Sequence, residues 1–139
     1  ARVNRWLYER REAREVRLLG RAIESLEIHA QGRAASVCLS LEDFDELGCT
    51  AADAEEIVNV PRSVAGVEAE LFFYELRDDE APAGRKTKVS MRSAEGLDAA
   101  EFCRDFGGGG HPRAAGCSLP GPMAQAKPRI LETLAQRLG

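Results

Sequence analysis

The stretch most capable of chemistry runs from Phe106 to Gly116 and reads Phe-Gly-Gly-Gly-Gly-His-Pro-Arg-Ala-Ala-Gly. Its four consecutive glycines carry no side chains, so a ligand can approach the main chain closely and meet its N–H groups. His111 follows directly, and its imidazole can donate a hydrogen bond to a phosphate oxygen or stack on a base. Pro112 suits the first turn of a helix, and a helix starting there would direct its positive end at the glycines. The pattern predicts a phosphate-binding loop formed by Gly108, Gly109, Gly110 and His111, with Arg113 as a further candidate.

A flexible linker and a purely structural tight turn are the alternatives for this run. Linkers mix glycine with serine and other polar residues, whereas these glycines lie between Phe106 and a small apolar segment. The run is not a Walker loop, because Gly-His-Pro stands where that loop needs Gly-Lys-Ser/Thr. It is not the dinucleotide fingerprint either, because we expect a helix rather than a strand before it. A lone histidine could also serve only to pin the loop.

Arg92 and Ser90 are the natural partners of the glycine run. Apolar and polar residues alternate from Lys86 to Arg92, which predicts a strand with Val89 and Met91 facing the core. Ser90 and Arg92 then share the opposite face, and the helix that follows leads to the glycines. We therefore expect loop and strand end to meet at one edge of the sheet. The alternative is an ordinary edge strand with exposed polar side chains.

The remaining pattern predicts an α/β fold: a single domain with a mixed central β-sheet flanked by helices. Val16, Leu19, Ile23 and Leu26 recur at helical spacing, which predicts a long amphipathic N-terminal helix, extended backwards by Trp6 and Leu7 and reaching about His29. Its arginine-rich face could contact nucleic acid or simply be solvated. Strands are expected over 35–41, 67–76 and 86–92, helix starts at Ser40, Thr50 and Asp98, and a last helix containing Ile130, Leu131, Leu134 and Leu138.

Composition narrows the functional classes. Nineteen basic and 23 acidic residues give a net charge of -4, which argues against coating duplex nucleic acid through bulk charge. The four cysteines are widely separated, which favours buried free thiols in a reducing cytoplasm over disulfides. No stretch is apolar enough to cross a membrane. The only histidines, His29 and His111, lie far apart, and no metal-ligand spacing or Ser-His-Asp arrangement occurs. The acidic residues between 42 and 46 are interpreted as a solvated face. These features predict a module that grips substrate without a catalytic residue, metal or cofactor of its own.

Gly108-Gly109-Gly110-His111, followed by Ala114-Ala115-Gly116, resembles the signature of the DHH-associated domain of the first type. This is the C-terminal substrate-binding domain of DHH-superfamily phosphoesterases. The segments 17–22, 41–44 and 89–93 resemble the same family, so the similarity covers nearly the whole chain. It implies a linker and entry helix over 1–32 that leads in from a DHH domain in cis, and a substrate-binding domain over 33–139. Ala1 in place of an initiator Met agrees with a fragment of a longer protein.

Within the superfamily the resemblance is greatest to bacterial oligoribonucleases (nano-RNases) that also remove phosphate from 3′-phosphoadenosine 5′-phosphate. It implies two Mn²⁺ ions in the DHH domain, and a terminal nucleotide of short single-stranded RNA, or a nucleoside 3′,5′-bisphosphate, held by this domain. The implied contacts are His111, the glycines, Ser90 and Arg92, with Asn59 and Arg62 near the cleft. The resemblance implies that the parent is a hydrolase, with a homodimer as one candidate state of the full-length protein. The 139 residues contain no Asp-His-His triplet, so this chain alone is expected to be inactive. The alternatives are a nucleotide-sensing or partner-docking module, or the same domain from a cyclic-dinucleotide phosphodiesterase or a single-stranded-DNA exonuclease.

Overall fold

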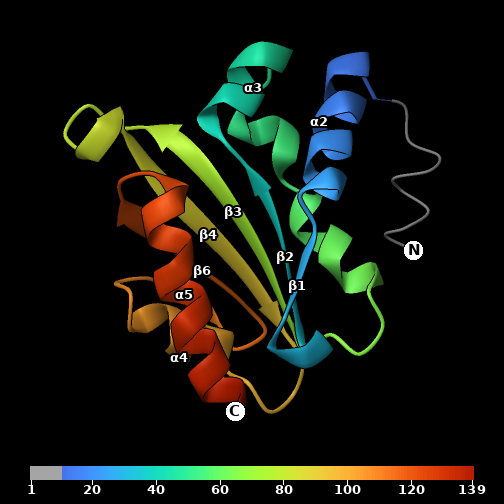
Figure 1. Ribbon diagram of the computed structural model, residues 1–139, viewed down its shortest axis with the longest axis vertical. Coiled ribbons are helices and arrows are strands. Elements are labelled where there is room, and N and C mark those ends of the chain that lie inside the picture. The colour runs from blue at the N-terminus through green and yellow to red at the C-terminus, as the bar shows by residue number, and fades with distance from the viewer. Residues whose placement is uncertain (1–10) are drawn as a thin grey trace.

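The computed structural model describes residues 11–139, which form a mixed β-sheet with helices on both faces (Figure 1). The sheet has six strands in the order β1-β2-β3-β4-β6-β5. Strands β2 and β3 are parallel, and every other neighbouring pair is antiparallel. The predicted α/β class with a mixed sheet is confirmed. The strands are β1 (Glu27–His29), β2 (Ala34–Leu39), β3 (Ala69–Arg77), β4 (Arg85–Ser93), β5 (Gly109–His111) and β6 (Ala114–Pro120).

The helices begin where the sequence offers caps. The Ser40 hydroxyl accepts a hydrogen bond from the Asp43 N–H (3.1 Å), and the Asp43 carboxylate accepts one from the Ser40 N–H (2.8 Å). Asp98 likewise accepts from the N–H of Glu101. These caps fix the predicted helix starts. The α-helices are α2 (Ala13–Glu24), α3 (Leu41–Leu47), α4 (Ala99–Arg104) and α5 (Met123–Leu138), and the 3-10 turns are η1 (Ala30–Gly32), η2 (Ala51–Ala54), η3 (Ile57–Ser63) and η4 (Pro82–Gly84).

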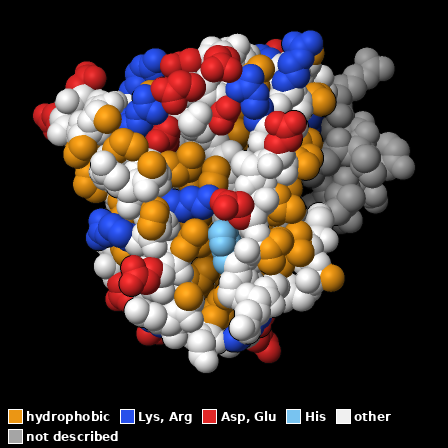
Figure 2. Space-filling view, in the orientation of Figure 1, with side chains coloured by type: hydrophobic (Ala, Val, Ile, Leu, Met, Phe, Trp, Pro, Cys, Tyr) orange, Lys and Arg blue, Asp and Glu red, His pale blue; other side chains and the backbone are white. Residues whose placement is uncertain are grey.

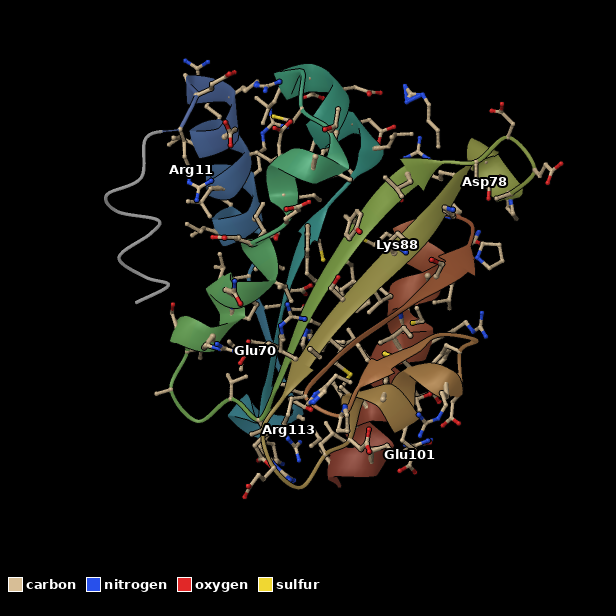
Figure 3. All side chains as sticks on the ribbon, turned by 180° about the vertical axis from the view of Figure 1, so that it is seen from behind. Arg11, Glu70, Asp78, Lys88, Glu101 and Arg113 are labelled. Atoms are coloured by element: carbon tan, nitrogen blue, oxygen red, sulfur yellow. The ribbon has the colours of Figure 1, made fainter. Side chains whose placement is uncertain are left out.

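Alternation along the strands divides the core between the two faces of the sheet. Phe73 and Met91 pack with Phe102 of α4 and Ile130 of α5 on one face. On the other face α2, α3 and the turns η2 and η3 pack over β2 and β3, around Phe72. The second cover lies mainly over β2 and β3, with η3 also reaching β4. Figure 3 shows no α-helix in front of β4 and β6. This half of the sheet is therefore uncovered on that face.

The first helix differs from its prediction in two respects. It ends at Glu24, and Glu27–His29 forms β1. The Ser25 hydroxyl explains this end, because it donates to the Ala22 carbonyl and accepts from the N–H of Cys38 on β2. The predicted apolar stripe is also not the buried one: Leu18 and Ala22 are fully buried, whereas 54% of Val16 and 51% of Ile23 are exposed. Trp6 and Leu7 lie outside the described residues.

The acidic cluster of α3 is bonded to arginines rather than merely solvated. Arg21 contacts Asp43 at 2.8 Å, and Arg85 contacts Glu42 at 2.7 Å. The hydrogen bonds from Arg85 lower the pKa of Glu42 to about 2. Figure 2 shows acidic and basic side chains interleaved at this end of the molecule. Such a surface offers no uniform field to a polyanion, and the arginines of α2 are partly used in holding α3.

Candidate functional site

The glycine run forms a β-hairpin, not a loop that opens a helix. Strand β5 (Gly109–His111) turns at Pro112 and Arg113 into β6. The prediction of a helix starting at Pro112 is therefore wrong. The Pro112 carbonyl is held by the Ala99 N–H (2.8 Å) and by the Ser93 hydroxyl (3.0 Å), so the turn is anchored to α4 and β4.

Close backbone packing, rather than an amide cup, explains two of the glycines. A Cβ at Gly108 would lie 2.0 Å from the Gly116 carbonyl oxygen, and one at Gly110 would lie 2.8 Å from the Ala114 carbonyl oxygen. The N–H groups of Gly107 and Gly108 donate to carbonyls at the end of α4, at 3.1 and 2.9 Å. Because these amides are engaged, the predicted cradle of glycine amides does not form at this half of the run. The linker alternative fails as well, since these residues are packed and paired.

Strand register places the predicted site side chains on one open surface. Arg92 of β4 pairs with Ala114 of β6, which pairs with His111 of β5. Neighbouring strands are about 4.8 Å apart, so the backbones at Arg92 and His111 are separated by about 10 Å. A long guanidinium and an imidazole can meet over that gap. The next cross-strand row contains Gly109, Gly116, Ser90 and Phe72, and the one beyond it contains Ser118, Lys88 and Tyr74.

The middle row gives this surface its shape. Gly109 and Gly116 contribute no side chains, so the row that leads to Ser90 is bare backbone on β5 and β6. A Cβ at Gly116 would lie 2.9 Å from the Val89 carbonyl oxygen, so β6 also packs closely against β4 there. Arg92 stands on one side of this glycine row and Lys88 on the other; Figure 3 shows Lys88 on the uncovered part of the sheet. Lys88 was not selected from the sequence, although its alternation with Ser90 was the available signal. A bare row with a cation on each side suits a phosphodiester or phosphate group.

His111 is exposed and its ring is oriented by the turn. The N–H of Arg113 donates to His111 Nδ1 at 3.0 Å, so the neutral ring carries its proton on Nε2. Nε2–H is then available to an anionic oxygen. Arg113 itself donates to the carbonyls of Ala94 (2.6 Å) and Leu97 (3.0 Å). Arg113 Nη1 thus fastens the hairpin to the segment that precedes α4.

A buried carboxylate lies beside the cationic row. Glu70 is the β3 neighbour of Arg92 in register and is only 9% exposed. Arg62 contacts one carboxylate oxygen at 3.4 Å, while the other oxygen has no hydrogen-bond partner. Burial raises the pKa of Glu70, and Arg62 and Arg92 partly offset that effect. The buried side chain of Asn59 also has an unbonded oxygen. Arg62 and Asn59 belong to η3, at its boundary with the open half-sheet. Glu70 was not predicted as a site residue, because nothing in the sequence marked it.

Other kinds of site are not built from these residues. Within residues 11–139, no group of three or more His, Cys, Asp or Glu side chains is placed to hold a metal ion. Over the same range, none of the helices combines the length and apolar character needed to span a bilayer. All four cysteines are free thiols; Cys49, Cys103 and Cys117 are buried as predicted, whereas Cys38 is half-buried.

Fold and sequence together define a class of domain. The family model of the DHHA1 domain matches residues 32–139, and the chain belongs to that family. It is 32% identical over 104 residues to the bifunctional oligoribonuclease and PAP phosphatase NrnA of Bacillus subtilis, covering 75% of this chain and 30% of that protein. The NrnA of Thermus thermophilus is 29% identical over 123 residues, covering 88% of this chain and 34% of that protein. The chain thus spans about a third of the length of these relatives.

Solved structures agree on the fold. An exopolyphosphatase-related protein from Bacteroides fragilis superimposes with a TM-score of 0.78 at 25% identity, covering 99% of this chain and 39% of that one. The pGpG-specific phosphodiesterase PggH of Vibrio cholerae superimposes with a TM-score of 0.53 at 12% identity, covering 91% and 40% of the two chains. The second likeness shows the fold alone.

Proposed function

We propose that this chain is the substrate-holding domain of a DHH-family phosphoesterase. It grips the terminal nucleotide of a short single-stranded RNA, or a nucleoside 3′,5′-bisphosphate. The observation that carries the proposal is the glycine row of Gly109 and Gly116, which lies beside the row of Arg92 and His111. Membership of the DHHA1 family, and the names of the relatives, support phosphate ester chemistry.

Each side chain has a definite part in this proposal. Arg92 presents a planar fork of donors to phosphate oxygens, His111 donates from Nε2, and Ser90 contributes a hydroxyl from the end of the glycine row. Gly109 and Gly116 let the ligand backbone lie close to the strands. Gly108 and Gly110 act indirectly, because they allow the β5–β6 approach that places His111.

Hydrolysis itself is assigned to a DHH domain in the parent protein. Mn²⁺ held there would activate the attacking water and neutralise phosphate charge, and the present domain would fix the nucleotide relative to it. Charge-assisted hydrogen bonds contribute about 1.5–3 kcal/mol each, and association costs roughly 4 kcal/mol or more. A few such contacts leave the isolated chain with an affinity of about 1 mM. We also propose that the parent protein is cytoplasmic.

Titration of the chain with AMP, followed by amide NMR shifts, tests the proposal. We expect the shifts to concentrate in β5, the start of β6 and the end of β4 around Arg92. His111→Ala should weaken binding by about tenfold, consistent with losing one charge-assisted hydrogen bond. Lys86→Ala is the matched control, since it removes a cation from the same face of β4, about 20 Å along the strand from Arg92. Shifts scattered over α2 or α5, with no effect of His111→Ala, would refute the proposal.

A nucleotide-sensing module without a part in turnover is the second candidate. The same row of Arg92 and His111 would bind a nucleotide in either function. His111→Ala in the full-length protein separates the two functions. Slower turnover of a dinucleotide supports substrate holding, whereas unchanged turnover with lost nucleotide binding supports sensing.

A further inference from the structure

A small hollow lies on the open side of the sheet. It is formed between η2 and strands β3 and β4 and has a volume of about 180 Å³. Ser90 lines the hollow and also belongs to the glycine row, so the two adjoin at Ser90. Neither Arg92 nor His111 lines it. The lining residues are Ala51, Ala54, Glu55, Phe72, Tyr74 and Ser90.

The lining combines flat apolar surface with a few polar groups. Phe72 and Tyr74 stack with ring centroids 4.8 Å apart and an interplanar angle of 27°. Phe44 meets the Tyr74 ring edge-on at 6.4 Å, which fixes its orientation. Ala54 is 1% exposed and keeps that wall shallow. The exposed Glu55 carboxylate adds hydrogen-bond acceptors at the rim. Stacking surfaces with a few edge acceptors are what a nucleobase requires.

The spacing along β4 relates this hollow to the proposed phosphate position. Ser90 and Arg92 are two residues apart on the same face, which is about 7 Å in a strand. A ribose bridges a gap of that order between a phosphate and its base. A nucleotide whose phosphate lies at Arg92 can therefore place its base between Tyr74 and Ser90 without leaving the surface of the sheet.

We propose that this hollow receives the base of the bound nucleotide, and that Glu55 favours bases that present an amino group. The proposal rests on the proposed function, because it takes the phosphate position from the row of Arg92 and His111. Adenine offers an N–H to the Glu55 carboxylate, whereas uracil offers a carbonyl oxygen at the corresponding edge. The site thus selects nucleotides bearing adenine over those bearing uracil.

Comparing AMP with ribose 5-phosphate on the 139-residue chain isolates the contribution of the base. We expect AMP to bind about tenfold more tightly, in keeping with one stacked base, and to add shifts at Ala51 and Tyr74. UMP should bind severalfold more weakly than AMP, and Glu55→Gln should narrow that difference, because an amide donates to uracil as readily as it accepts from adenine.

Ala51→Leu fills the hollow without removing a core side chain. It should reduce AMP binding to the level of ribose 5-phosphate and leave ribose 5-phosphate binding unchanged. Ala52→Leu is the matched control, since Ala52 is exposed on the same 3-10 turn and does not line the hollow. Thermal unfolding of both variants verifies that each one folds.

The outcomes separate this inference from the proposed function. Equal affinities of AMP and ribose 5-phosphate, with both ligands shifting the row of Arg92 and His111, would overturn the base site and leave phosphate holding intact. If neither ligand shifts that row, the proposed function fails. In that case a titration with adenosine, which carries no phosphate, tests the base site by itself. Shifts at Ala51 and Tyr74 support a base site in the hollow, and their absence overturns it.

Discussion

Replacing Gly108 with alanine tests how the glycine run positions the site. The added Cβ would lie 2.0 Å from the Gly116 carbonyl oxygen and 2.7 Å from the Cys117 Cβ. These atoms belong to β6, whose pairing with β4 and β5 restricts any movement. Overpacking a core costs about 1–3 kcal/mol. Because the obstacle here is paired backbone and not a flexible side chain, we expect the upper end, about 3 kcal/mol. That loss lowers the Tm by roughly 10 °C.

Urea unfolding measures this change, with neighbouring glycines as matched controls. A Cβ at Gly109 would meet only Arg104, at 4.0 Å, so Gly109→Ala should change the free energy of unfolding by less than about 1 kcal/mol. Gly107→Ala meets no atom within 4 Å, but its φ of +82° is unfavourable for alanine and should cost about 1–2 kcal/mol. If Gly108→Ala were as stable as Gly109→Ala, the close approach of β5 to β6 would not be the reason for glycine at this position.

Three further predictions concern stability. Burial raises the pKa of Glu70 in the fold, so ionisation of this carboxyl opposes folding as pH rises through the folded pKa. Glu70→Gln should therefore stabilise the chain near pH 7 and lose that advantage at about pH 3. An equal difference at both pH values in denaturant unfolding would contradict this cause. Arg85 lowers the pKa of Glu42 to about 2. The stability contributed by this ionised carboxylate is therefore present above the ordinary pKa of 4.5 and is lost as pH falls toward 2. Glu42→Gln should accordingly destabilise by up to about 1 kcal/mol at neutral pH, and unfolding curves of the two proteins should coincide near pH 2. Leu18→Ala should lower the free energy of unfolding by about 2–5 kcal/mol, and Val16→Ala should lower it by less than about 1 kcal/mol. Calorimetry showing the reverse order would place the other face of α2 against the sheet.

The sequence by itself determined those features of this protein that depend only on residues close together in the chain. The cap at Ser40 and Asp43 works within one helical turn, and the alternation along Lys86–Arg92 reports directly which residues of a strand share a face. The family signature around His111 is likewise contiguous, so the class of domain could be read before any fold was known.

Tertiary structure alone decided how those parts combine, because register and packing depend on contacts between distant segments. The glycines were predicted to expose amides, but β6 fills the space beside Gly108 and Gly110. The side of α2 that is buried depends on the sheet beneath it, which no periodicity within the helix can specify. Pairing of β4, β6 and β5 brought Arg92 and His111 into one row, and the meeting of η2 with β3 made the hollow beside Ser90.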